Sequence, residues 1–559
     1  MKKIISLFFA IIFCTTAFSQ TAFKRYYIQF TNKNNSPYSI SNPSAYLSAR
    51  AILRRTNQHI PIDSLDLPVN PAYLDSVVFK GAIIVNPTKW LNGVTVATSD
   101  TNVLLAIEQL SFVQKLNPVS IVNAAKIHYK KNINYITRTN SKIISARSTS
   151  STYNYGSALT QIEIINGIGL HQAGYQGQGM VIASLDDGYD NANVLSCFDS
   201  LRNDNRLLGW KDFVSLNNSD MFQLDTHGSM TLSDMAAFLP GQMIGTAPKS
   251  GYWLLRSEND STENPIELYN WVSAAEFADS VGADIITSSL GYSTFDDAAF
   301  NYTYADMNGK TTPCAIAAGI AASKGMIVCN SAGNDGNSSW HYITTPGDAD
   351  SIITVGSVDQ YGNYASTSGH GPTSDGRIKP DVVALGDGAA IINPTDGTTS
   401  LGYGTSFSCP IIAGMTACLW QEYPTKTNKE IIQAIKQSAS LYSNPDNTLG
   451  YGIPNYGLAS VILGLASDNT PINQSNVPYV FPNPFSDALD LIYFNNTTDD
   501  ENIQLFDMLG RLVYYKTITS SGRGFHNYTL NDLNLLSKGV YVMVVSTATQ
   551  QQMIKIVKM

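Results

Sequence analysis

Four polar residues that lie far apart in the chain carry the side chains needed to hydrolyse an acyl bond. Asp186 ends the stretch "MVIASLD", His227 opens "HGSMTLSDMAAFL", and Ser406 lies in "GYGTSFSCP". Asn334 lies in the turn-like stretch "SAGNDG". A hydroxyl nucleophile, an imidazole base, a carboxylate that orients the base and an amide donor together make an acyl-transfer site. The chain order Asp, His, Ser is one of the known orders of such a triad.

Each of these residues also has an ordinary structural interpretation. Asp-Gly after a strand and Asn-Asp-Gly after another strand are typical of turns. A serine at the start of a helix is common because its hydroxyl satisfies backbone groups there. The acyl-transfer interpretation therefore depends on whether the fold brings the four residues together.

The elements around these residues predict that it does. Between about residues 153 and 465, apolar strands ("GMVIASL", "GYWLLRS", "DIITSSL", "MIVCNSAG") alternate with helical patterns ("GSMTLSDMAAFL", "YNWVSAAEFADSVG", "CAIAAGIAASKG"). Continuous apolar strands between helices predict an α/β domain whose parallel sheet is covered by helices on both faces. Ligands bind at the carboxyl ends of such strands. Two of the four residues end strands there and two open helices, so we expect them to meet at that edge.

This part of the chain resembles the subtilisin-like serine peptidases. The matching stretches, in order, are "SLDDGYD", "THGS", "SSLG", "SAGNDG", "SGHGPTSDGRIKPDVVALG", "GTSFSCP" and "GYGIPN". The alternative enzyme fold is an α/β-hydrolase, but its Gly-x-Ser-x-Gly motif is absent around Ser406. A different class of function is a catalytically silent binding or adhesion module on the cell surface.

The resemblance implies a role for each site residue. Asp186, His227 and Ser406 would form the catalytic triad, and Asn334 would complete the oxyanion hole. The backbone of Ser289, Leu290 and Gly291 would pair with an extended peptide substrate. Asp335 could reach the specificity pocket and favour a basic side chain.

The sequence departs from the family pattern beside the catalytic groups. Asp187 stands where the family usually has a hydroxyl, and we expect it to face away, because two inward carboxylates would raise one pKa. Ser229 replaces the usual threonine, and Phe407-Ser408-Cys409 replaces a Met-Ala pattern. Pro410 is expected within the first helical turns, where a missing N–H is tolerated.

The N-terminus indicates export. Residues 1–19 have two lysines, an apolar stretch and a small-residue cleavage site, which predict a signal peptide. Residues 20–119 resemble the α+β propeptide of Bacteroidetes-type peptidases of this family, through "YYIQF", "YLSARAILRR" and "KWLNGV". This segment would assist folding and inhibit the enzyme; an unrelated binding domain is the alternative. Residues 120–152 form a polar linker that would contain the processing site, before the peptidase domain of residues 153–465.

The C-terminal end has a different composition. A second polar linker spans residues 466–476, and residues 477–559 resemble the sorting domain of the type IX secretion system, through "VFPNPFSD", "IQLFDMLGRLVY" and "LLSKGVYVMVV". A small β-sandwich is expected, and a carbohydrate-binding module is the alternative. The resemblance implies export through the outer membrane to the surface or the medium.

Composition excludes some partners. The net charge of −9 disfavours nucleic acid, and after the signal peptide no apolar run is long enough to span a membrane. The mature chain has five cysteines, Cys197, Cys314, Cys329, Cys409 and Cys418, which we expect to be buried thiols. No metal-ligand spacing occurs, so we expect no required cofactor; structural calcium is compatible with the family but has no located site. A monomer that acts on protein or peptide substrates is expected.

Overall fold

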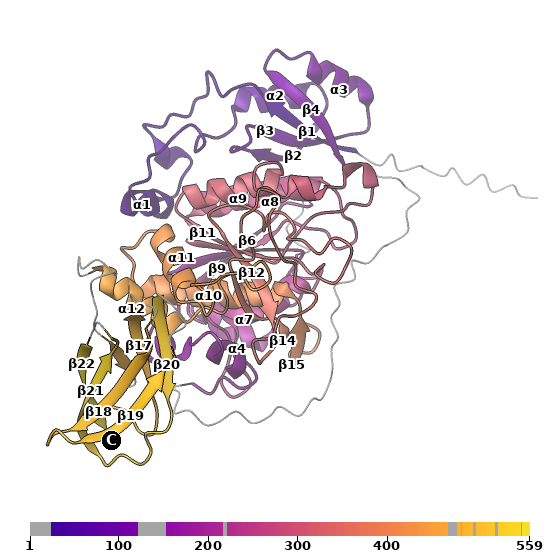
Figure 1. The fold of residues 1–559 in the computed structure, drawn as a ribbon. Coiled ribbons are helices and arrows are strands. Elements are labelled where there is room, and N and C mark those ends of the chain that lie inside the picture. Colours follow the sequence, from indigo (N-terminus) through magenta and orange to yellow (C-terminus); the bar gives the residue numbers. More distant parts are fainter. Residues whose placement is uncertain are drawn as a thin grey trace, which may run out of the picture.

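The structure is a computed structural model in which three parts follow one another along the chain (Figure 1). It describes residues 24–120, 153–215, 221–467, 478–481, 483–495, 499–519, 524–548 and 551–559. The expected signal peptide and nearly all of the two expected linkers lie outside these residues. The boundaries proposed from the sequence therefore remain predictions.

The middle part is built on a seven-stranded sheet with the order β13-β12-β11-β10-β5-β9-β6, in which every paired strand is parallel. The strands are β5 (Val181–Asp186), β6 (Leu207–Asp212), β9 (Gly251–Arg256), β10 (Ile285–Ser288), β11 (Ile327–Ser331), β12 (Ile353–Val358) and β13 (Val382–Leu385). Every residue of β5, β10, β11, β12 and β13 is buried. Strands that are apolar throughout can be buried on both faces only when helices cover both.

Helices cover both faces of this sheet (Figure 1). On one face α8 (Ile266–Val281) and α9 (Pro313–Ser323) pack against each other over one apolar cluster. On the other face α7 (His227–Ala236) packs against α10 (Thr405–Glu422), which contacts the central strands. The remaining helices there are α4 (Leu159–Glu163), α5 (Ile168–Gln172), α6 (Asp199–Asn203), α11 (Asn428–Gln437) and α12 (Tyr456–Ser467). The expected parallel α/β domain is confirmed.

Two short antiparallel hairpins complete this part. They are β7 (Phe238–Leu239) with β8 (Met243–Ile244), and β14 (Asp387–Ile392) with β15 (Thr399–Tyr403). β15 leads directly into α10, so the hairpin fixes where that helix begins.

The N-terminal part is a small α+β domain that lies against α8. Its antiparallel sheet has the order β2-β3-β1-β4, with β1 (Lys24–Phe30), β2 (Ile83–Thr88), β3 (Gly93–Thr98) and β4 (Val113–Ser120). Its helices are α1 (Ala49–Asn57), α2 (Pro71–Phe79) and α3 (Thr101–Glu108). The Tyr27 ring on β1 stacks on Tyr269 of α8, with ring centroids 4.2 Å apart.

One stretch of this domain differs from its sequence pattern. "SVVFKGAIIV" predicts a single strand, but its first half belongs to α2 and only its second half to β2. The Asn70 side chain accepts from the Ala72 N–H and Pro71 follows it, which starts a helix that continues through the β-branched residues. Capping and packing here outweigh the strand preference of valine.

The C-terminal part contains two antiparallel sheets over one apolar core. One has the order β16-β17-β20 and the other β19-β18-β21-β22. The strands are β16 (Tyr479–Phe481), β17 (Leu489–Asn495), β18 (Glu501–Asp507), β19 (Leu512–Ile518), β20 (Gly524–Leu530), β21 (Gly539–Ser546) and β22 (Gln551–Lys558). This is the small β-sandwich that the sequence predicts.

Candidate active site

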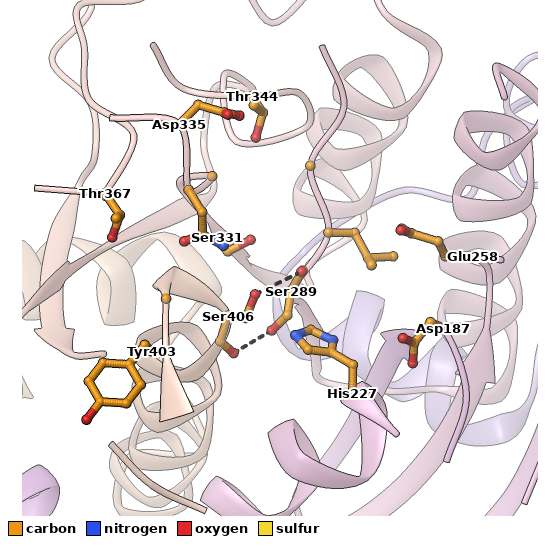
Figure 2. Close-up of a pocket in the computed structure, with 15 residues that line it drawn as sticks. Asp187, His227, Glu258, Ser289, Ser331, Asp335, Thr344, Thr367, Tyr403 and Ser406 are labelled. Carbon is orange, nitrogen blue, oxygen red and sulfur yellow. Dashed lines mark hydrogen bonds between the residues drawn. The ribbon is translucent and has the colours of Figure 1, made fainter. Parts of the chain in front are cut away.

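A cavity of about 300 Å³ lies where the carboxyl ends of the central strands meet. All the predicted site residues except Asp186 line it: His227, Ser289, Leu290, Gly291, Asn334 and Ser406. In Figure 2 the imidazole of His227 points toward Ser406 and Ser289. The structure therefore brings together side chains that the sequence places far apart.

Asp186 lies behind His227 and is almost fully buried. Its Oδ1 is 2.6 Å from His227 Nδ1 and accepts the Asp187 N–H at 3.0 Å. Its Oδ2 accepts from the hydroxyl of Thr231, one turn along α7, at 2.9 Å. These contacts hold the Nδ1 edge of the imidazole and leave Nε2 as the nitrogen on the cavity side. Thr231 was not anticipated, although its spacing of four residues from His227 places it on the same helix face.

His227 is the first residue of α7, and the backbone around it is tightly packed. A Cβ added at Gly228 would lie 2.2 Å from the Gly188 carbonyl oxygen and 3.0 Å from Asp186 Cβ. Glycine is therefore required for the helix to start so close to the turn after β5. The Phe407 ring packs near the imidazole, with ring centroids 6.0 Å apart. Phe407, a departure from the family pattern, thus forms part of the wall behind the histidine.

Ser406 is the second residue of α10. The preceding Gly404 has φ 138°, a conformation that favours glycine, and it turns the chain from β15 into the helix. The Ser406 hydroxyl donates to the Ser289 carbonyl oxygen at 3.4 Å, as the dashed lines in Figure 2 show. Backbone N–H groups of the first turn of α10 lie beside this hydroxyl, at the positive end of the helix dipole.

Pro410 lies within the first two turns of α10, as expected, but not where a missing N–H is without consequence. It is the sixth residue of the helix, beyond the four whose N–H groups have no helical partner. A proline there removes the N–H that would bond to the Ser406 carbonyl. The Ser289 hydroxyl replaces that donor and bonds to the Ser406 carbonyl oxygen at 2.8 Å. The missing helical bond thus becomes a link between the nucleophile and the predicted substrate-binding strand.

Asn334 is tied to the same helix start. Its Oδ1 accepts from the Thr405 N–H at 2.8 Å and from the Thr405 hydroxyl at 3.1 Å. Because the amide oxygen is held in this way, the Nδ2 group is the end of the side chain that can donate to a ligand. Asn334 itself is exposed and lines the cavity.

The expectation that Asp187 faces away is wrong. Asp187 is 3% exposed, lines the cavity, and has a carboxylate oxygen within 4.8 Å of ligand atoms of Asp186 and His227. Its Oδ1 accepts the Gly228 N–H at 3.2 Å, and this contact turns it inward. Burial, followed by the charge of Asp186, raises the pKa of Asp187 well above its usual range.

Two further carboxyl groups line the cavity. Glu258, which sequence analysis missed, accepts from the Tyr292 hydroxyl at 3.1 Å. It follows β9 by two residues, so the strand-end rule that selected Asp186 also applies to it. Asp335 lies at the opposite end of the cavity (Figure 2), where burial raises its pKa.

Within the described residues, two sets of side chains have donor atoms spaced closely enough for a metal ion. They are Asp186 with Asp187 and His227, and Glu258 with Glu263 and Glu267. The first set is already engaged by the hydrogen bonds given above. The five cysteines of the mature chain are free and buried, as expected.

Comparison with known proteins identifies the domain that carries this cavity. Residues 177–452 match the model of the subtilase family. This stretch is a subtilase domain. Residues 25–142 match the peptidase S8 propeptide domain of Bacteroidota, and residues 479–559 match a secretion system C-terminal sorting domain.

Curated relatives match about half of the chain. Serine protease AprX of Bacillus subtilis is 28% identical over 309 residues, which are 50% of this chain and 65% of that protein. Subtilisin of Bacillus pumilus is 28% identical over 295 residues, 52% of this chain and 94% of that protein. The crystal structure of MycP1 from Mycobacterium smegmatis is 20% identical, covers 55% of this chain and 86% of that chain, and gives a TM-score of 0.43.

The C-terminal match bears on where the protein acts. A type IX sorting domain indicates export to the cell surface or the medium. Among the described helices, none combines the length and apolarity needed to cross a bilayer.

The inward position of Asp187 predicts a pH-dependent cost to stability. A carboxyl group whose pKa is raised by folding destabilises the fold as it ionises, so stability falls as pH rises through the folded-state pKa. Asp187→Asn keeps the acceptor for Gly228 and cannot ionise. In a Ser406→Ala background we expect it to raise Tm by about 2–4 °C or more at pH 8 and by less at pH 4.5, measured by calorimetry.

The matched control is Asp396→Asn, which replaces an exposed aspartate and should leave Tm nearly unchanged at both pH values. An Asp187→Asn protein that is less stable than its parent at pH 8 would contradict the assignment of a buried, destabilising carboxylate.

Proposed function

We propose that this chain is the precursor of an exported serine endopeptidase that hydrolyses peptide bonds through Asp186, His227 and Ser406. The observation that carries the proposal is the 2.6 Å contact between His227 and Asp186 on the wall of a cavity that also holds Ser406. The cavity lies at the carboxyl edge of the sheet, where ligands bind in α/β folds.

In the first half of the reaction, Ser406 Oγ attacks the scissile carbonyl carbon while His227 Nε2 takes its proton. When substrate binds, the Ser406 hydroxyl would give up its long 3.4 Å bond to the Ser289 carbonyl and donate to the imidazole instead. Catalytic hydrogen bonds are often long in the free enzyme and tighten in the complex. Asp186 holds the imidazole in orientation and stabilises its charged form. His227 then gives the proton to the leaving amine, and an acyl-enzyme remains.

In the second half, His227 takes a proton from water, the hydroxide attacks the acyl carbon, and Ser406 leaves with the proton returned by His227. In both halves negative charge develops on the carbonyl oxygen. The Asn334 amide and the backbone N–H groups at the start of α10 are positioned to donate to that oxygen. The strand from Ser289 to Gly291 would bind the substrate backbone as an added β-strand.

The flanking domains complete the proposed role. The N-terminal domain would assist folding and keep the enzyme inactive until the linker is cut, and the C-terminal domain would be recognised by the type IX secretion machinery. We propose a monomer without a required cofactor. The alternative, a silent binding module with the same fold, is separated from a peptidase by a fluorophosphonate probe, which labels Ser406 only when the triad activates it.

Loss of either proton-transfer partner should abolish hydrolysis. Ser406→Ala or His227→Ala should leave at most the roughly 10³–10⁴-fold rate over water that remains when a triad member is lost. Turnover of a fluorogenic peptide by the processed enzyme measures this. Near-normal turnover by either variant would refute the triad.

Asn334 allows a sharper test, because a turn residue and an oxyanion donor respond differently to substitution. A turn residue tolerates Asn334→Gly. An oxyanion donor does not: in subtilisin the loss of such a donor lowers kcat by about 10²–10³. We expect a loss of that size for both Asn334→Gly and Asn334→Leu, with KM little changed, because the bond forms fully only in the transition state. A defect confined to KM would assign Asn334 to the turn alone.

The C-terminal sandwich has its own apolar core, so its removal should not disturb the cavity. A chain without residues 477–559 should keep peptidase activity but accumulate in the periplasm. Fractionation with activity assays measures both. Normal delivery of the truncated chain to the surface or the medium would contradict the sorting role.

A further inference from the structure

The N-terminal domain touches the subtilase domain at two separate places. Its sheet lies along α8, whereas α1, in the long insertion between β1 and α2, docks at the C-terminal ends of α8 and α9. In Figure 1 α1 lies apart from the sheet, beside the end of α9. The side chains that dock α1 are Arg50, Arg54, Arg55 and Gln58.

Arg54 binds the C-terminal ends of two helices at once. Its guanidinium donates to the carbonyls of Ala283, just past α8, and of Lys324, just past α9, the latter at 3.2 Å. It also bonds to the Asp279 carboxylate at 2.5 Å. Helix C-termini leave carbonyls without helical partners and carry partial negative charge, so a buried cation is well matched to both.

Two other side chains of this segment bind the same edge of the sheet. Arg50 donates to the Gly282 carbonyl at 2.8 Å and pairs with Asp284. Gln58 donates to the Gly325 carbonyl at 2.8 Å. Gly282 and Gly325 lie in the turns that lead into β10 and β11, respectively.

Asp284 joins the three central strands at their starting ends. Its carboxylate accepts the N–H of Val181, the first residue of β5, at 2.8 Å. Its carbonyl accepts the N–H of Ile327, the first residue of β11, at 3.0 Å. Ile285, the first residue of β10, is paired with Ile182 of β5 and with Ile327 of β11. The side chains of α1 therefore hold the corner at which the register of β5, β10 and β11 is set.

The same contact buries several charges together. Asp279 is fully buried and bonds to Arg55 at 2.9 Å and to Lys89 at 2.9 Å, in addition to Arg54. Lys324 reaches Asp66 of the insertion at 3.0 Å. Removing one partner from such a buried cluster strongly destabilises the fold, because the remaining charge is left uncompensated. Folding of the subtilase domain around Asp279 thus depends on cations that the N-terminal domain supplies.

The sheet contact is of a different kind. Glu276, in the middle of α8, accepts the N–H groups of Lys89 and Trp90 at 2.7 and 2.9 Å, and Asn86 bonds to Asn270 at 3.0 Å. The Glu276 bonds lie along the middle of α8. Asn86 also donates to the Phe213 carbonyl, just past the edge strand β6, at 2.7 Å, so none of these bonds involves β5, β10 or β11. They can hold the two domains together without affecting strand register.

We propose that the α1 insertion is the template on which β5, β10 and β11 take their register, whereas the sheet face serves for attachment. This deepens the proposed precursor function and rests on it. Parallel sheets fold slowly because their pairings are distant in the chain. The N-terminal domain is synthesised first, so the side chains of α1 are available to bind the corner while the strands close.

The test uses the full-length chain with Ser406→Ala and compares folding and unfolding rates in denaturant by tryptophan fluorescence. Substituting a contact made in the folding transition state slows folding, whereas substituting a later contact speeds unfolding. We expect Arg54→Lys and Gln58→Ala to slow folding by about fivefold or more, with unfolding changed by less than about twofold. The matched sheet-face variant Asn86→Ala should show the reverse.

Two controls sharpen the result. Leu53→Gln changes an exposed side chain of α1 and should alter neither rate by more than about twofold. If Arg54→Lys does not fold, Gln58→Ala alone decides, because it removes a neutral amide, which donates to the Gly325 carbonyl and accepts the Asn428 N–H. Faster unfolding with unchanged folding in the α1 variants would overturn the proposal. Since the chain lacks Ser406, the readout does not depend on peptidase activity, and a failure of one proposal is distinguishable from a failure of the other.

Discussion

The register of β5, β10 and β11 fixes the distances between groups that must meet. Parallel strands end at one edge, so Ser289 after β10 and Asn334 after β11 line a single cavity, and Asp186 at the end of β5 lies behind His227 on its wall. A slip of one residue would turn each side chain to the opposite face of its strand. His227 and Ser406 arrive on helices that pack on the same face of this sheet. Their positions therefore depend on the same register.

The helix that carries the nucleophile is fixed by polar bonds as well as by apolar packing. Pro410 withholds one backbone donor, and the Ser289 hydroxyl supplies it to the Ser406 carbonyl. Thr405 supplies another donor to Asn334. Ser406, the predicted substrate strand and Asn334 are thus connected through the first turn of α10. Such a connection limits their movement relative to one another.

Local signals in the sequence were sufficient for the fold and for most of the site. The strand that ends at Asp186 and the helices that begin at His227 and Thr405 are specified by residues nearby in the chain. The direction of Asp187 did not follow, because it is set by the N–H of Gly228, 41 residues away. The partners of Arg54 were equally hidden, since Asp279 lies 225 residues further along. In both cases the feature that could not be predicted is a contact between segments distant in the chain, which local propensity does not determine.

The adjacent carboxyl groups of Asp186 and Asp187 lie in one turn but have different hydrogen-bond partners. Asp186 contacts His227, the Thr231 hydroxyl and a backbone N–H, whereas Asp187 accepts from the Gly228 N–H and is buried beside the charge of Asp186. The pKa of Asp187 is raised as a result. An ionised Asp187 would put a second negative charge near the imidazole and hold its proton more tightly. In the proposed mechanism a protonated Asp187 would leave Asp186 as the one carboxylate that orients His227, so the turn "LDDG" would not place two competing charges beside the imidazole.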